Sequence, residues 1–88
     1  MVTKTSILPA ERTAFERAHK LLYSGVTLLD HGDRAAVDTL LASVNMFSEI
    51  NHKHAAMEFY FKALRAFSAE PSPEYRADYE RWSSTRNA

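Results

Sequence analysis

The sequence predicts an all-α protein, a small helical bundle of three main helices plus a short C-terminal helix, which we expect to form a dimer. Apolar residues recur every three or four positions along three successive stretches, and this is the period of a helix. No stretch alternates apolar and polar residues as a half-buried strand would. Turn-forming residues separate the stretches, with Gly32 after the first and Pro71 after the third. We therefore treat residues 1–88 as one helical domain and expect residues 1–8 and 83–88 to be flexible.

The composition narrows the possible classes of protein. The 88 residues include no cysteine, so disulfides and thiolate metal sites are excluded. Eleven basic and eleven acidic residues give a formal charge of zero, and no net field attracts nucleic acid or an anionic membrane. No segment resembles a signal peptide or reaches the ~20 apolar residues of a membrane span. We expect a soluble cytoplasmic protein.

The first two helices have recognisable ends. Pro9 suits a first helical position because it lacks an N–H and has a fixed φ. Gly25, on the buried flank, should either kink the first helix or permit a close helix crossing, and Gly32 should end the helix. Asp33 is a good N-cap for the second helix. The second helix has a narrow apolar stripe of Val37, Leu40, Leu41, Val44 and Phe47.

The connection at residues 51–54 has two interpretations. The apolar pattern shifts in phase here, and Asn51 could close one helix and cap the next, which favours a break. No glycine or proline enforces that break. One long bent helix from Arg34 to Phe67 is therefore the alternative.

Residues 55–67 form the most apolar and most aromatic stretch, and they predict a protein-contact surface. On a helix they give two adjacent apolar faces, with a narrow polar strip of Glu58, Lys62 and Arg65. A surface helix normally has one apolar stripe, so this helix needs more cover than a short chain offers. A central helix buried on three sides within one monomer is the alternative. The predicted contact residues, including edge residues and the last helix, are Met46, Ile50, Phe59, Tyr60, Phe61, Leu64, Phe67, Tyr75, Tyr79 and Trp82.

The last helix should begin with Ser72 as N-cap and Pro73 at the first helical position. Tyr75, Tyr79 and Trp82 then share one side of it. This aromatic row either packs back on the core or serves as an anchor for a partner, because tyrosine and tryptophan are enriched at interaction hot spots.

Four histidines raise the question of a metal site. Glu49 and His52 have the i, i+3 spacing of a carboxylate-bridged metal helix, and His54 and Glu58 are an i, i+4 pair. Such a site needs ligands from several facing helices, and the sequence has no second Glu-x-x-His motif. We expect no metal and no cofactor, and at most a weak pH response of His52 and His54. The sequence has no phosphate-binding glycine loop and no nucleophile elbow, so we expect no enzymatic activity.

A helix-turn-helix that binds DNA is the alternative regulatory class, because the second helix, a short connection and the third helix follow one another. The third helix is apolar where a recognition helix should present arginine, asparagine or glutamine to base edges. The zero net charge also removes the phosphate attraction that supports non-specific binding. Binding to nucleic acid is therefore a weaker prediction than binding to a protein.

Two resemblances bear on function. The pattern Ala56-x-x-x-Tyr60-x-x-Ala63-Leu64 resembles the second helix of a tetratricopeptide repeat, but the sequence lacks a 34-residue period, so we interpret this pattern as convergent packing. At whole-chain level the sequence resembles small helical bacterial regulators. One type is the QslA quorum-sensing antiactivator, which binds a LuxR-family activator and blocks its dimerisation. The YmgB/AriR biofilm regulators are another, through the leucine-rich second helix followed by Ser48-Glu49-Ile50. The resemblance implies a regulatory protein that binds other proteins and has no catalytic site. Together with the apolar faces of residues 55–67, we expect a homodimer that binds a protein partner such as a transcription factor and inhibits it by covering its surface.

Overall fold

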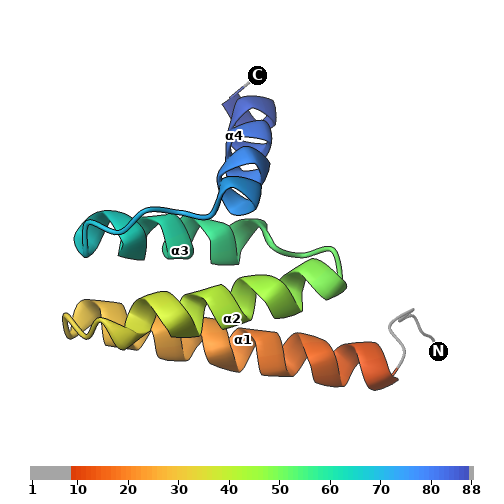
Figure 1. The fold of residues 1–88 in the computed structure, drawn as a ribbon. Coiled ribbons are helices and arrows are strands. Elements are labelled where there is room, and N and C mark those ends of the chain that lie inside the picture. The colour runs from red at the N-terminus through yellow and green to blue at the C-terminus, as the bar shows by residue number, and fades with distance from the viewer. Residues whose placement is uncertain (1–8, 88) are drawn as a thin grey trace.

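The structure, a computed structural model, consists of four helices over the residues it describes, with no strand among them. It describes the backbone of residues 9–87 and the side chains of residues 12–81, 83 and 84. The helices are α1 (Pro9–Asp30), α2 (Ala35–Glu49), α3 (His54–Ala66) and α4 (Pro73–Asn87) (Figure 1). The predicted all-α fold is confirmed.

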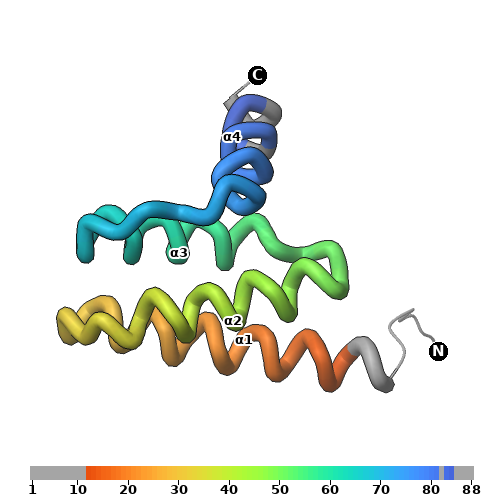
Figure 2. Tube along the Cα trace, viewed as in Figure 1, coloured from red at the N-terminus to blue at the C-terminus, as the bar shows by residue number. Residues whose placement is uncertain are grey.

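α1, α2 and α3 form one antiparallel layer, and α4 projects from it (Figures 1 and 2). α2 lies in the middle and packs against α1 on one side and against α3 on the other. The overall dimensions are 49 × 32 × 18 Å, so the molecule is flat. The core therefore lies along α2, whose buried residues are Ala36, Leu40, Ser43, Val44 and Phe47.

Gly25 allows α1 and α2 to cross at close range. A Cβ atom at this position would lie 2.4 Å from Leu40 Cδ2 and 3.3 Å from the Leu40 backbone nitrogen. Leu40 is fully buried, so its side chain has little room to move aside. Of the two predicted roles for Gly25, the structure supports the close crossing.

The first three helices end in the same way, with a residue of positive φ in a Schellman motif. Gly32 (φ 72°) ends α1, Asn51 (φ 60°) ends α2 and Ser68 (φ 55°) ends α3. In each case the following residue donates its N–H to a carbonyl five residues earlier, as in His52 N–H to Phe47 O at 2.8 Å. The predicted break at residues 51–54 is confirmed, and the long bent helix is excluded.

The N-terminal ends follow the predictions in part. The N-cap of α2 is Arg34, which makes no side-chain cap hydrogen bond, so the prediction of Asp33 as N-cap is wrong by one residue. Asp33 Oδ1 still accepts a hydrogen bond from the Ala35 N–H at 2.9 Å, just before the helix. Asn51 does not cap α3, because Lys53 occupies the N-cap position and makes no side-chain cap hydrogen bond. Asn51 is used instead in the turn that closes α2.

α4 is longer than the sequence indicated. It begins at Pro73, and Ser72 Oγ accepts a hydrogen bond from the Tyr75 N–H at 3.4 Å, as predicted. The prediction of a short last helix is wrong, because α4 has 15 residues, as many as α2, while α3 has 13. The helix continues through residues 83–87, which the sequence analysis assigned to a flexible polar tail. Residues 1–8 and 88 lie outside the described residues.

No helix in residues 9–87 combines the length and the apolar character that a membrane span requires.

Candidate protein-interaction surfaces

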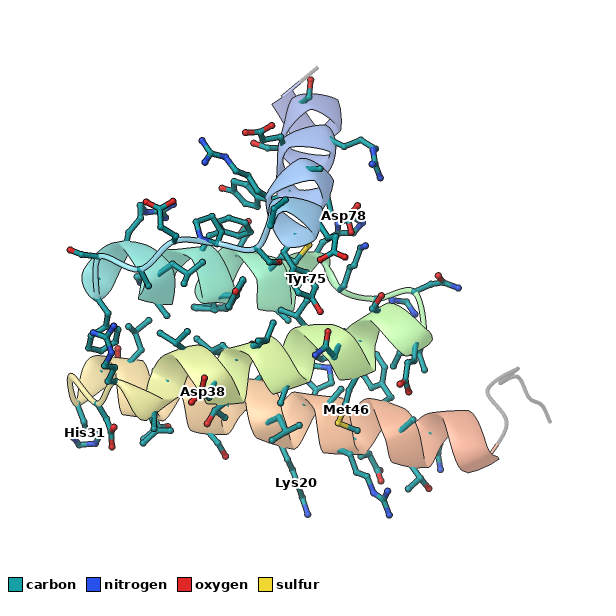
Figure 3. The ribbon with its side chains drawn as sticks, in the orientation of Figure 1. Lys20, His31, Asp38, Met46, Tyr75 and Asp78 are labelled. Atoms are coloured by element: carbon teal, nitrogen blue, oxygen red, sulfur yellow. The ribbon has the colours of Figure 1, made fainter. Side chains whose placement is uncertain are left out.

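α4 packs on α3 through two tyrosine rings. The Tyr75 ring meets the Tyr60 ring edge-on, with 5.8 Å between centroids. The Tyr79 ring stacks on the Phe61 ring, with centroids 4.5 Å apart and planes 27° apart. Figure 3 shows Tyr75 and Asp78 at the base of α4, where it meets the helical layer. One row of the predicted aromatic face of α3 is thus covered by the same chain.

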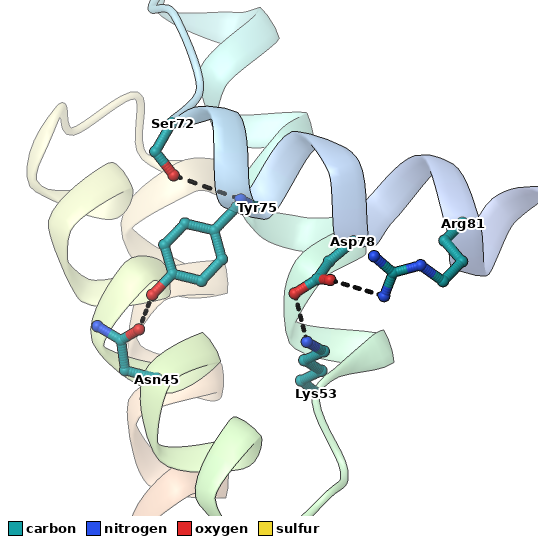
Figure 4. Close-up of polar contacts among 6 residues, drawn as sticks. All are labelled: Asn45, Lys53, Ser72, Tyr75, Asp78 and Arg81. Carbon is teal, nitrogen blue, oxygen red and sulfur yellow. Dashed lines mark hydrogen bonds and ion pairs between the residues drawn. The ribbon is translucent and has the colours of Figure 1, made fainter.

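Polar contacts fix the position of α4 beside these rings (Figure 4). The Tyr75 hydroxyl donates a hydrogen bond to Asn45 Oδ1 on α2. The Lys53 ammonium forms an ion pair with Asp78 at 2.5 Å, and Arg81 pairs with the same carboxylate at 3.1 Å from within α4. We call Asn45, Lys53, Tyr60 and Phe61 the α4-binding surface.

Two ionisable groups at this junction have shifted pKa values. The hydrogen bond from Lys53 holds the pKa of Asp78 below its usual range, with Arg81 adding to the effect. Burial raises the pKa of Tyr60, and the neighbouring Tyr75 and Asp38 raise it further. Both shifts follow from the fit of α4 against α2 and α3.

Three of the predicted contact residues lie inside the monomer. Tyr60, Phe61 and Leu64 are 4%, 8% and 3% exposed. Because α2 covers one side of α3 and α4 crosses another, the chain supplies much of the cover that we expected from a partner. While α4 stays in place, these three side chains offer no surface to a second protein.

The other predicted contact residues lie at the edges of the core. Met46, Ile50, Phe59 and Phe67 are partly buried. The Phe59 ring has the Lys62 ammonium 6.0 Å from its centroid, and the Phe67 ring has the Arg34 guanidinium at 5.9 Å. Phe59 and Tyr79 also line an open hollow of about 310 Å³ with Glu58, Lys62 and Arg65. The side chain of Trp82 lies outside the described residues.

The structure places a second aromatic surface on α1. Phe15, His19 and Tyr23 follow one another at intervals of four residues along the helix. The His19 ring lies 4.4 Å from Phe15, 6.0 Å from Tyr23 and 5.2 Å from Phe47 on α2, centroid to centroid. The His52 ring meets Phe15 edge-on at 5.6 Å. We call these five residues the aromatic–histidine groove.

Two open hollows adjoin this groove. One, of about 240 Å³, is lined by Phe15, His19, Leu22, Phe47, His52, His54 and Ala55. The other, of about 730 Å³, shares Phe15, His19 and Tyr23 and is bordered by Thr13, Glu16, Arg17 and Lys20. The rings and several charged side chains of α1 thus line the same open surface. Lys20 projects away from the helices (Figure 3).

Tyr23 distinguishes this surface from the rest of the molecule. Tyr23 is 67% exposed, and among the described residues it is the one large hydrophobic residue that is exposed. This surface was not predicted, because His19 and Tyr23 are not aliphatic residues and do not register as part of an apolar helix face. The four-residue spacing of Phe15, His19 and Tyr23 was the available signal.

Among the described residues no three histidine, aspartate or glutamate side chains converge as a metal ion would require. His19, His52 and His54 line the same hollow. The other described residues that line it include the rings of Phe15 and Phe47 and no carboxylate.

Comparison of the chain with protein-family models, with curated proteins and with solved structures gives no match.

Proposed function

We propose that this chain is a small regulatory protein that acts by protein–protein contact. It associates with itself, and it binds a partner protein through the aromatic–histidine groove. The observation that supports the groove is the exposure of Tyr23 beside the rings of Phe15 and His19. Tyrosine anchors combine a large apolar ring with a hydroxyl that accepts or donates a hydrogen bond, and they are frequent hot spots.

The anatomy of the groove suits an apolar helix face or loop of a partner. The rings would be removed from water, while the charged side chains of Glu16, Arg17 and Lys20 would stay hydrated and select the orientation. The resemblance to QslA-type antiactivators makes a LuxR-family transcription activator the first partner to test. Binding there would inhibit the partner by covering a surface that the partner needs for its own assembly.

Substitution of the exposed anchor tests the groove. We expect Tyr23→Ala to weaken partner binding about 30-fold or more, since loss of a hot-spot side chain costs roughly 2 kcal/mol or more. The fold should be unaffected because the side chain is mostly exposed. Full-length protein is immobilised, and the proteins that it retains are quantified by mass spectrometry. The affinity of a retained partner, or of a purified LuxR-family activator, is then measured by calorimetry.

Glu74→Ala is the matched control, because Glu74 is exposed on α4, away from the groove. It should bind like the wild type. Equal retention of the same proteins by wild type and Tyr23→Ala would contradict the proposed groove. Binding to duplex DNA with an affinity that falls as salt rises would instead support the DNA-binding alternative.

A further inference from the structure

The first two turns of α4 carry the contacts with α2, α3 and Lys53 that were described above. Tyr75, Asp78 and Tyr79 make these ring contacts, the hydrogen bond and the ion pair. A helix of this length extends roughly 22 Å, and Figure 1 shows α4 projecting from the helical layer. Isolated helices of this length are marginal in water, so α4 depends on packing against other residues.

The segment that joins α3 to α4 has the properties of a hinge. It runs over residues 67–72, and Ser68 within it has φ 55°, a left-handed conformation that residues with a Cβ rarely adopt. Pro71 prevents the helix from continuing through it. Straightened, six residues span up to about 20 Å, which is enough to carry α4 off its own chain.

We propose that α4 is exchanged between two copies of this chain, so that the α4 of each copy packs on the α4-binding surface of the other. This inference rests on the self-association in the proposed function and identifies the surface that mediates it. The binding surface is built for this occupant, because it consists of two aromatic rings, an amide and an ammonium that match Tyr75, Asp78 and Tyr79 at i, i+3 and i+4.

Exchange keeps each of these contacts. It changes the conformation of the hinge and the copy of the chain on which α4 packs. The same side chains meet in the same geometry, so exchange loses no burial of Tyr60 or Phe61. Straightening the hinge releases the left-handed backbone at Ser68, which favours the exchanged form. It also breaks the Ser68 N–H and Ala69 N–H hydrogen bonds that close α3, which opposes exchange. An open monomer would expose the Tyr60 and Phe61 rings to water, so a released α4 should be replaced by the α4 of a second copy.

A charge-exchange experiment separates exchange from packing within one chain. Lys53→Asp places two carboxylates together at the junction, and Asp78→Lys places two ammonium groups together. When the two full-length variants are mixed, exchange of α4 brings opposite charges together at both junctions of the mixed dimer. Arg81 moves with α4 and is present in every combination. The double variant restores the pair within one chain and serves as the folding control.

We expect the mixture to form a mixed dimer about tenfold tighter than either variant forms with itself, as two repulsive contacts become attractive. Native mass spectrometry measures the mixed dimer, with an affinity tag on one variant to separate the masses. Light scattering on wild type over a concentration series accompanies it. Ser68→Gly should lower the wild-type dimer fraction, because glycine removes the strain that favours an open hinge.

The outcomes separate the two proposals. A mixed dimer favoured over both self-dimers supports exchange. A wild-type dimer with no preference in the mixture overturns exchange but leaves self-association through another surface. If wild type stays monomeric at every concentration and the mixture of the two variants forms no dimer, both exchange and self-association are overturned. Binding of a partner at Tyr23 is decided by the separate experiment above.

Discussion

At the scale of single residues, three positions with positive φ close α1, α2 and α3, and only the first is a glycine. Gly32 adopts this conformation without penalty, whereas Asn51 tolerates it and Ser68 is strained by it. From Gly32 to Asn51 to Ser68, the residue at this position is therefore less and less suited to the left-handed conformation. A substitution of Ser68, at the C-terminal end of α3, should therefore increase the stability of the fold.

We predict that Ser68→Gly stabilises the monomeric fold by about 0.5–1 kcal/mol, because glycine has no Cβ to clash in the left-handed region. Urea unfolding at low protein concentration, where association does not contribute, should show a higher midpoint with an unchanged slope. Gly32→Ala is the reverse control and should lower the midpoint by a similar amount. A lower midpoint for Ser68→Gly would show that residue 68 is not left-handed in solution.

At the scale of helices, the packing of α1 on α2 depends on Gly25. Alanine would raise helix propensity by up to about 1 kcal/mol, but its Cβ would lie 2.4 Å from Leu40 Cδ2. Overpacking of a buried site costs typically about 1–3 kcal/mol, and the clash should exceed the gain. We predict that Gly25→Ala destabilises the protein by about 1–2 kcal/mol.

The measurement for Gly25→Ala is again a urea midpoint, now within a double-mutant cycle. Leu40→Ala removes the side chain that the new Cβ would strike, so the double variant should lose less stability than the sum of the two single losses. Strict additivity would mean that the clash is absorbed elsewhere. A net gain for Gly25→Ala alone would contradict the close crossing.

The sequence predicted helix ends better than it predicted helix neighbours. Gly32, Asn51 and Pro73 act locally, so the turns and the start of α4 could be inferred from residue type. The two apolar faces of α3 were recognised, but whether α4 or a second chain covers them depends on how α4 crosses, which no local pattern encodes. α4 was expected to be short because residues 83–87 carry no apolar periodicity.

The candidate surface was also hard to predict, for a physical reason. His19 is polar in any sequence pattern, yet in the fold it lies between the rings of Phe15, Tyr23 and Phe47. His52 joins them only because the α2–α3 turn brings it back over α1. Surfaces assembled from separate helices require the tertiary structure, whereas Phe59 and Phe67 were visible within one helical stretch.

At the scale of the whole molecule, the chain is thinner and more extended than a compact domain of its length. Its radius of gyration is 14.2 Å, whereas a compact domain of this size has about 12 Å. A molecule only 18 Å across its shortest dimension has a large surface for its volume, and the aromatic–histidine groove is part of that surface. The groove borders α1 and the α4-binding surface lies on α2 and α3, so partner binding and self-association would use different parts of the molecule.

The attachment of α4 to this layer should depend on pH through Asp78. The pKa of Asp78 is lower in the folded protein than in the unfolded chain, so its ion pair with Lys53 adds stability at pH values above the unfolded pKa of about 3.9. That contribution is lost as the pH falls through the lowered pKa. Because both side chains are partly exposed, at 27% and 25%, it should amount to about 1 kcal/mol or less.

We predict that wild type exceeds Asp78→Asn in unfolding free energy at pH 6 and that the difference shrinks steadily below pH 4. Urea unfolding at each pH measures this difference, and Arg76→Gln is a control, since its ion pair with Glu80 lies within α4 and is mostly exposed. A difference that stays constant down to pH 2 would mean that Asp78 contributes by packing and not by charge. The ring contacts of Tyr75 and Tyr79 on α3 do not titrate in acid, so α4 should stay on the layer and the radius of gyration measured by X-ray scattering should not change over the same pH range.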